Sequence, residues 1–134
     1  MPLTQFAANK LIDHQLGKTA YTLPTIYVGV SSTTPTVAGA NVTEPSTGAY
    51  ARVATSGATW NASAAGATSN ASVITFPAAT ADWLSAANIT YGLLYDAATA
   101  GNLIGFGLIS GTPAPVVNGT TLSIAAAGLT LTLS

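Results

Sequence analysis

The chain has 134 residues, enough for one domain with its own core, and no cysteine, which leaves neither a disulfide framework nor a thiolate metal site. Only 5% of its residues are charged, against about 25% in a typical domain. Its three cations are too few for the basic surface that nucleic-acid binding or membrane-surface binding needs. A 49% hydrophobic chain of net charge −1 is also not expected to be disordered.

The apolar and polar fractions both consist mostly of small neutral residues, with 26 alanines and 32 serines and threonines. Such a surface suits a protein that packs against copies of itself or against other subunits, because interface cores are depleted of charge. A compositional bias of the host would give the same residues. The first residues lack a cationic segment followed by an apolar one, and no run reaches the roughly 20 apolar residues that span a bilayer, so we expect a soluble protein.

A short amphipathic helix is predicted at about residues 4–16. Its apolar residues are spaced three and four apart, at Leu3, Phe6, Ala7 and Leu11. Thr4 is the candidate N-cap, and Gly17 is the candidate stop. Because isolated helices of this length are marginal in water, the apolar stripe must dock on the rest of the domain.

After Pro24 the hydrophobic period changes to that of β-strands. Strands are predicted at 25–32, 49–54, 73–76, 89–95, 103–109 and 129–133, with a weaker one at 120–124. Residues 96–102 have hairpin length, so Tyr95 and Leu103 should start an antiparallel pair. Asn118-Gly119 predicts a second tight turn. The pattern indicates a single, mainly β domain over residues 1–134, an antiparallel β-sandwich with an N-terminal helix.

Two long stretches, 33–48 and 55–72, are predicted to be loops or arms. Loops of this length are uncommon in a compact domain unless they are functional or ordered by a partner. The second stretch is rich in Ser, Gly, Ala, Thr and Asn and is interrupted by Trp60. That tryptophan either folds back on its own sheet or anchors a neighbouring subunit.

No catalytic, cofactor or metal site is predicted. One histidine and no cysteine exclude a Cys-His pair and the histidine-rich zinc motifs. His14 lies in the predicted helix with no GxSxG motif elsewhere, so we interpret it as a solvated side chain. Asp82 and Asp96 sit next to predicted turns, where aspartate commonly caps the backbone. Gly105-Phe106-Gly107 lacks the third glycine of a dinucleotide-binding loop. An enzyme is therefore not expected.

The remaining recognition features are aromatic side chains, which can stack on sugars or on apolar groups of a partner. Trp83 and Tyr91 are assigned to core packing. The residues expected at a partner interface are Phe6, Leu11, Tyr50, Arg52 and Trp60.

Five segments resemble a family of small tailed-bacteriophage proteins, often labelled tail fibre or minor structural proteins. They are Leu3-Thr-Gln-Phe-Ala-Ala-Asn-Lys-Leu-Ile-Asp-His, Pro24-Thr-Ile-Tyr-Val-Gly-Val-Ser, Gly48-Ala-Tyr-Ala-Arg-Val, Ile74-Thr-Phe-Pro-Ala-Ala-Thr-Ala-Asp-Trp83 and Tyr91-Gly-Leu-Leu-Tyr-Asp-Ala-Ala-Thr-Ala-Gly-Asn-Leu103. The resemblance extends to the closing Leu129-Thr-Leu-Thr-Leu-Ser. It implies a structural protein of the virion, assembled in the cytoplasm of the bacterial host, with no chemistry in its motifs.

Two locations in the virion are consistent with these features. Small size, low charge and arm-like segments favour a capsid decoration (cement) protein on the particle exterior. A tail fibre or tail-tip component is the alternative, although fibres are more often long, repetitive and trimeric, and no repeat or heptad is visible. The expected partners are other virion subunits, either the major capsid protein or tail proteins, together with copies of the chain in a homo-oligomer. Neither nucleic acid nor a membrane is expected as a partner. A module that binds host surface glycans through Trp60, Tyr50 and the Asn-rich loops is a further hypothesis.

Overall fold

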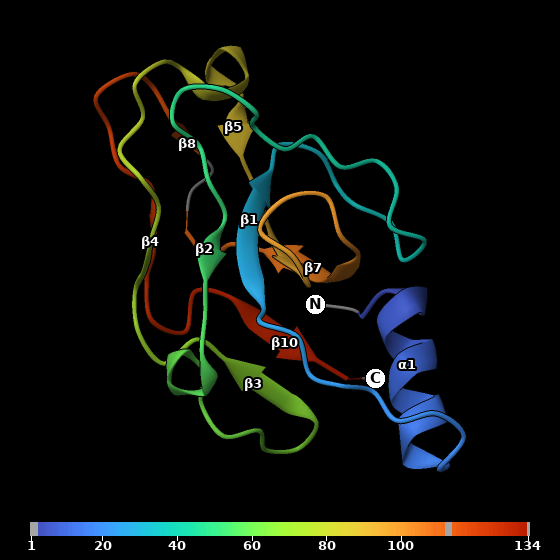
Figure 1. The fold of residues 1–134 in the computed structure, drawn as a ribbon. Coiled ribbons are helices and arrows are strands. Elements are labelled where there is room, and N and C mark those ends of the chain that lie inside the picture. Colours follow the sequence, from blue (N-terminus) through green and yellow to red (C-terminus); the bar gives the residue numbers. More distant parts are fainter. Residues whose placement is uncertain (1–2, 112–113, 134) are drawn as a thin grey trace.

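The structure, a computed structural model, describes residues 3–111 and 114–133 (Figure 1). One helix is followed by short strands and two 3-10 turns. Their bounds are α1 Gln5–Gln15, β1 Tyr27–Ser31, β2 Val53–Ala54, η1 Gly57–Thr59, β3 Ala67–Ser69, β4 Ile74–Thr75, η2 Trp83–Ala86, β5 Asn88–Ile89, β6 Tyr91–Tyr95, β7 Leu103–Leu108, β8 Ala114–Pro115, β9 Ser123–Ile124 and β10 Thr130–Thr132.

The central element is a four-stranded antiparallel sheet in the order β2-β1-β6-β7. Strands β6 and β7 form the predicted hairpin, in which Tyr95 pairs with Leu103. Asp96 closes its turn, since its Oδ1 accepts a hydrogen bond from the Asn102 N–H at 2.6 Å. The hairpin prediction is therefore confirmed, and Asp96 caps a turn as expected.

Three two-stranded antiparallel ribbons surround this sheet, namely β3 with β10, β4 with β9, and β5 with β8. In Figure 1 the β4 segment runs along one side of the molecule, and β3 with β10 lies below the central sheet. The mainly β prediction with one N-terminal helix is confirmed. A sandwich of two large sheets is not confirmed, because among the described residues only one sheet has more than two strands.

Several strands differ from their predicted bounds. The 49–54 strand shrinks to β2, because Gly48 and Ala49 both have positive φ values, 68° and 62°, and turn the chain before Val53. The 89–95 strand is interrupted at Thr90, whose N–H donates to Ser31 and whose carbonyl accepts from Ile109. Strands β3 and β8 were not predicted, since neither carries an apolar alternation.

Helix α1 begins and ends as predicted. The Thr4 hydroxyl accepts a hydrogen bond from the Ala7 N–H, and Gly17 adopts a φ of 71° after the last turn. The N–H groups of Gly17 and Lys18 donate to the carbonyls of His14 and Asp13, which is the Schellman pattern. Only Ala7 of the helix is buried.

The segment before α1 covers the outer edge of β7. Leu3 forms a β-bridge with Gly105, and the Thr4 N–H donates to the Ile104 carbonyl at 2.9 Å. The Thr4 hydroxyl also donates to the Leu103 carbonyl. These bonds satisfy part of a sheet edge that would otherwise be open to other chains.

The core lies on both faces of the central sheet. The larger cluster includes Val28, Leu94 and Ile124, together with Phe76 and Trp83. Tyr50 packs against it, with its ring parallel to that of Phe76 and edge-on to that of Trp83. The smaller cluster consists of Leu93, Tyr95, Leu103 and Phe106, with Tyr91 packed against it. Burial on two faces explains why β6 reads as a nearly continuous apolar run.

Both predicted loop stretches are bonded to the body of the domain. Residues 33–48 contain no helix or strand, but buried Ser31 holds their base, because its Oγ accepts from the N–H groups of Thr33 and Thr43. Residues 55–72 contain η1 and β3. The side chain of Asn70, fully buried, donates to the carbonyls of Ser72 and Ala125 and accepts from the Leu129 N–H.

Candidate interaction surface

An apolar groove of about 700 Å³ lies between α1, the segment that returns from it, and the β3–β10 ribbon. Ala7 and Leu11 form its helical wall, and Leu23 lies on the returning segment. Leu131 lies on the C-terminal strand β10, and Leu133 follows that strand. In Figure 1 these elements occupy the lower half of the molecule, with α1 on one side and β3 on the other.

Trp60 lines the groove on the side opposite the helix. Its indole Nε1–H donates to the Thr55 hydroxyl at 3.2 Å, and its backbone bridges to Asn70. The ring is half-buried and packs against the larger core cluster. Trp60 therefore folds back on its own domain and still offers part of its ring to an occupant of the groove.

The groove is uncharged. None of the described residues that line it is Asp, Glu, Lys, Arg or His. Its polar groups are hydroxyls of serine and threonine and the phenol of Tyr21. Burial, with a contribution from the negative charge of Asp96, raises the pKa of Tyr21, so this phenol also stays neutral. Such a surface favours an apolar, uncharged occupant.

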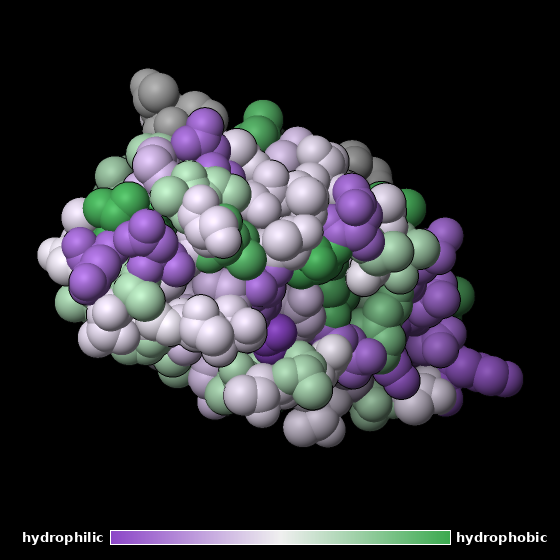
Figure 2. Space-filling model, turned by 90° about the horizontal axis from the view of Figure 1, so that it is seen from above, coloured by the Kyte–Doolittle hydropathy of each residue, from purple (hydrophilic) through white to green (hydrophobic). Residues whose placement is uncertain are grey.

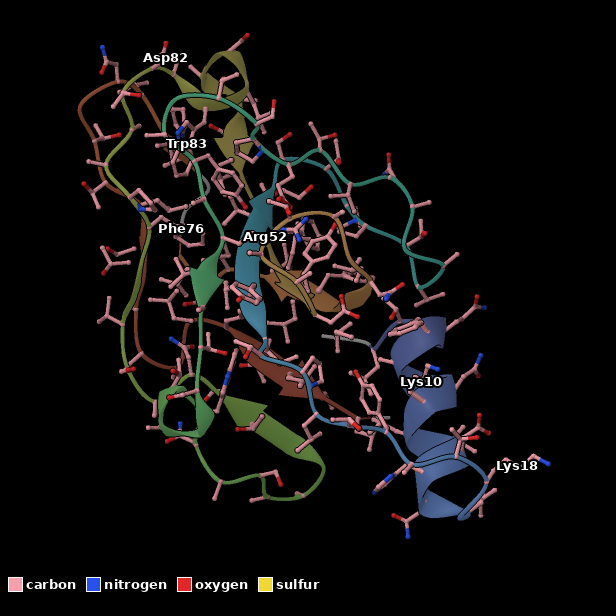
Figure 3. The ribbon with its side chains drawn as sticks, viewed as in Figure 1. Lys10, Lys18, Arg52, Phe76, Asp82 and Trp83 are labelled. Carbon is pink, nitrogen blue, oxygen red and sulfur yellow. The ribbon has the colours of Figure 1, made fainter. Side chains whose placement is uncertain are left out.

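Tyr50 and Arg52 lie elsewhere, in a polar cluster above the sheet. The Arg52 Nε donates to Glu44 at 2.9 Å, and its Nη1 donates to the carbonyls of Ala97 and Ala100 at 2.9 and 2.8 Å. Its guanidinium also lies 3.4 Å from the centre of the Tyr95 ring. In Figure 3 the Arg52 side chain lies within the body of the molecule, not at its rim.

Tyr50 joins the same cluster from the core side. Its hydroxyl accepts from the Val30 N–H at 3.1 Å. Burial, with the Glu44 carboxylate adding to it, raises the pKa of Tyr50 well above the ordinary tyrosine value. Gly29 makes room for the cluster, because a Cβ there would lie 2.8 Å from the Tyr50 hydroxyl. This cluster fastens the 33–52 segment to the central sheet.

The structure thus brings together two of the five residues expected at an interface, Leu11 and Trp60. Phe6 lies at a smaller polar hollow near the β6–β7 turn, with the Lys10 ammonium 5.7 Å from its ring centre. Sequence reasoning missed Leu23, Leu131 and Leu133. Leu23 lies between Thr22 and Pro24, and Leu131 and Leu133 alternate with threonine more than 100 residues later, a pattern that does not reveal a shared surface.

Two titratable side chains outside these clusters accept hydrogen bonds from backbone N–H groups. The His14 Nδ1 accepts from the Tyr21 N–H, and the Asp82 carboxylate accepts from the Asn118 N–H. Within residues 3–111 and 114–133, no group of three or more His, Cys, Asp or Glu side chains could hold a metal ion. In the same part of the chain, no helix is both long and apolar enough to cross a bilayer.

The surface as a whole is weakly polar. Figure 2 shows one face on which pale, near-neutral residues predominate and strongly hydrophilic ones form small groups. Hydrophilic side chains gather at the right-hand edge, the side on which α1 lies, and Figure 3 shows Lys10 and Lys18 projecting outward from that helix and the turn after it.

The chain is thus a small, mainly β domain with an apolar groove. The family model described as podophage GP4 fiber I protein gp80 matches residues 2–132, so the chain belongs to this family of phage fibre proteins. It is therefore a virion structural protein of the fibre type, and the resemblance to small tailed-phage virion proteins is confirmed. No curated protein matches the chain significantly.

Proposed function

We propose that the chain is a subunit of a tail fibre, assembled from copies of itself and attached to tail proteins. The observation that carries this proposal is the match to a family of podophage fibre proteins over residues 2–132. Size, low charge and arm-like segments favour capsid decoration, and the fibre alternative fits the name of the matched family at least as well.

The arrangement of the two long segments supports the same choice. The decoration hypothesis depends partly on 33–48 and 55–72 acting as arms that reach across neighbouring subunits. In the structure, the Arg52–Glu44 pair and Ser31 tie the first segment to the sheet, and Asn70 ties the second to Leu129, the residue before β10. Segments that are bonded this way offer less reach to distant capsid subunits.

Glycan binding has less support than subunit contact. Sugars are recognised by aromatic stacking together with many directed hydrogen bonds. Trp60 supplies an aromatic face in the groove, but its Nε1–H is already bonded to Thr55, and no described charged, Asn or Gln side chain lines the groove. Tyr50, the other expected stacking residue, lies in the core cluster.

The proposal is tested by the copy number of the chain in purified phage particles, with heads and tails separated. Quantitative mass spectrometry against the major capsid protein and a tail protein of known stoichiometry gives the ratio. We expect the chain in the tail fraction, in small copy number. A copy number comparable to that of the major capsid protein, in the head fraction, would overturn the fibre assignment and restore the decoration protein.

A further inference from the structure

One dipeptide of the chain, Asn118-Gly119, is chemically reactive in water. An asparagine loses its side-chain amide when the backbone nitrogen of the next residue attacks it, and glycine shields that nitrogen least because it has no Cβ. Of the seven asparagines in the chain, only Asn118 precedes a glycine. Asn118 is exposed, and a Cβ added at Gly119 would meet no described atom within 4 Å, so water reaches both residues.

These two residues form the tight turn that the sequence predicts. The Thr120 N–H donates to the Val117 carbonyl at 3.0 Å, and Gly119 has a φ of 84°, whereas Asn118 does not have a positive φ. This combination is a type II turn, in which the ψ of Asn118 is about 120°. The nitrogen of Gly119 reaches the Asn118 side chain only when it eclipses the Asn118 Cβ about the Cα–C bond, and this ψ keeps the two apart. The closed turn is therefore held in a conformation that does not react.

Two hydrogen bonds fasten the turn to the segment before η2. The Gly119 N–H donates to the carbonyl of buried Ala79 at 2.8 Å, and the Asn118 N–H donates to the Asp82 carboxylate at 2.8 Å. The Gly119 nitrogen must lose its proton to attack, so its bond to Ala79 has to break first. Asp82 is exposed, and in Figure 3 it lies at the upper end of the molecule. Exposed contacts of this kind open more readily than the core, so the turn can open without global unfolding.

We propose that Asn118 is a modification site, at which the side-chain amide is lost when the turn opens, and that the bond to Asp82 protects it. In the open turn the Gly119 nitrogen gives its proton to hydroxide and forms a bond to the Asn118 Cγ. The bond between Cγ and the side-chain nitrogen breaks, and that nitrogen takes a proton from water and leaves as ammonia. Water then opens the succinimide ring at either carbonyl, which gives an aspartate or an isoaspartate residue. This modification is independent of the fibre assignment, because it follows from the turn alone.

Both products should prevent the turn from closing as before. Each adds a carboxylate close to that of Asp82, and like charges repel each other. In the isoaspartate product the backbone also runs through the former side chain and is one methylene longer, so the Gly119 N–H no longer meets the Ala79 carbonyl. Modification at Asn118 is therefore a lasting record that a copy has opened here.

The first test compares the rate of amide loss in the folded chain with the rate in guanidinium chloride, at the same mildly alkaline pH. Peptide mapping by mass spectrometry identifies the modified asparagine. In the denaturant we expect Asn118 to be modified before the other asparagines. In the folded chain its modification should be slower by about tenfold or more, because only the open fraction reacts. Equal rates in the two conditions, or earlier modification of another asparagine in the denaturant, would overturn the proposal.

The second test concerns the role of Asp82 in the folded chain. Asp82→Ala removes the acceptor and should speed modification of Asn118 about fivefold, whereas Asp82→Asn keeps an acceptor oxygen and should react at nearly the wild-type rate. Asp96→Ala is the matched control, because the Asp96 carboxylate also accepts from a backbone N–H, that of Asn102, in a different turn. Circular dichroism verifies that the variants are folded. A wild-type rate in Asp82→Ala, or equal acceleration in Asp82→Asn or in Asp96→Ala, would show that the bond to Asp82 does not protect the site.

A third measurement follows the modified copies. Their added negative charge separates them from unmodified copies by anion exchange, and their melting temperature is then compared with that of the unmodified fraction. We expect the modified fraction to melt at a lower temperature, because the turn no longer closes. Identical melting temperatures would mean that the turn closes again, and would overturn the inference that modification records opening.

Discussion

The Arg52 cluster allows a quantitative prediction about stability. Arg52→Met keeps an apolar side chain at this position but removes the charge and every donor. The Arg52 side chain is 8% exposed and that of Glu44 is 18% exposed, so the substitution leaves a partly buried carboxylate without its cation. It also removes donors from the carbonyls of Ala97 and Ala100. Breaking a buried pair costs about 3–5 kcal/mol, and the partial exposure of Glu44 sets the expectation at the lower end, about 3 kcal/mol.

Urea unfolding followed by circular dichroism measures this loss, which also corresponds to a melting temperature lower by about 10 °C for a domain of this size. Arg52→Met combined with Glu44→Gln should be more stable than Arg52→Met alone, by about 1 kcal/mol or more, because the carboxylate no longer carries a charge. Lys10→Met is the matched control, since Lys10 is exposed on α1 and should change stability by less than about 0.5 kcal/mol. A loss in Arg52→Met as small as that of the control would refute the account of the cluster.

Three further predictions concern other buried contacts. The raised pKa of Tyr50 means that the folded chain keeps its phenol proton to higher pH than the unfolded chain. The free energy of unfolding therefore has its full contribution from this group below about pH 10 and falls as pH rises further. Tyr50→Phe should flatten that fall in a pH series of urea unfolding, and an unchanged dependence of the unfolding free energy on pH would contradict the prediction. Asn70→Ala removes a fully buried side chain that bonds three backbone groups, and should cost about 3 kcal/mol or more in the free energy of unfolding; a cost below about 1 kcal/mol would argue against this role. Gly92→Ala places a Cβ at 2.6 Å from the Leu129 Cδ1, and should destabilise by about 1–3 kcal/mol, with Leu129→Val recovering part of the loss; simple additivity of the two changes would disprove the clash.

The helix ends and the hairpin turn were predictable from the sequence because the residues that form each feature lie next to one another in the chain. Thr4 and Gly17 mark the two ends of α1, and the residues between Tyr95 and Leu103 have the length and composition of a hairpin turn. In each case the bonding partners are near in sequence, so residue type and spacing are sufficient.

Features that depend on distant partners were not predictable. β3 consists of Ala67, Thr68 and Ser69, which have no apolar alternation, and it becomes a strand because β10 pairs with it and Asn70 fixes the adjacent backbone. The same reason applies to the groove, whose leucines come from segments far apart in the chain. Arg52 was expected at an interface because it lies close to Tyr50, but its position could only be known once the Ala97 and Ala100 carbonyls were placed beside it.

The placement of charge relates the stability of the domain to its tendency to associate. The chain has seven charged residues, and four of them, Arg52, Glu44, Asp82 and Asp96, are bonded within the described structure. The other three lie on or just after α1. Buried neutral side chains such as Asn70 and Ser31 supply much of the remaining polar bonding. Little charge is then left on the outer surface to keep copies apart, since mutual repulsion grows with net charge. The groove, which no charged side chain lines, is therefore the described surface on which charge opposes contact with another apolar surface least.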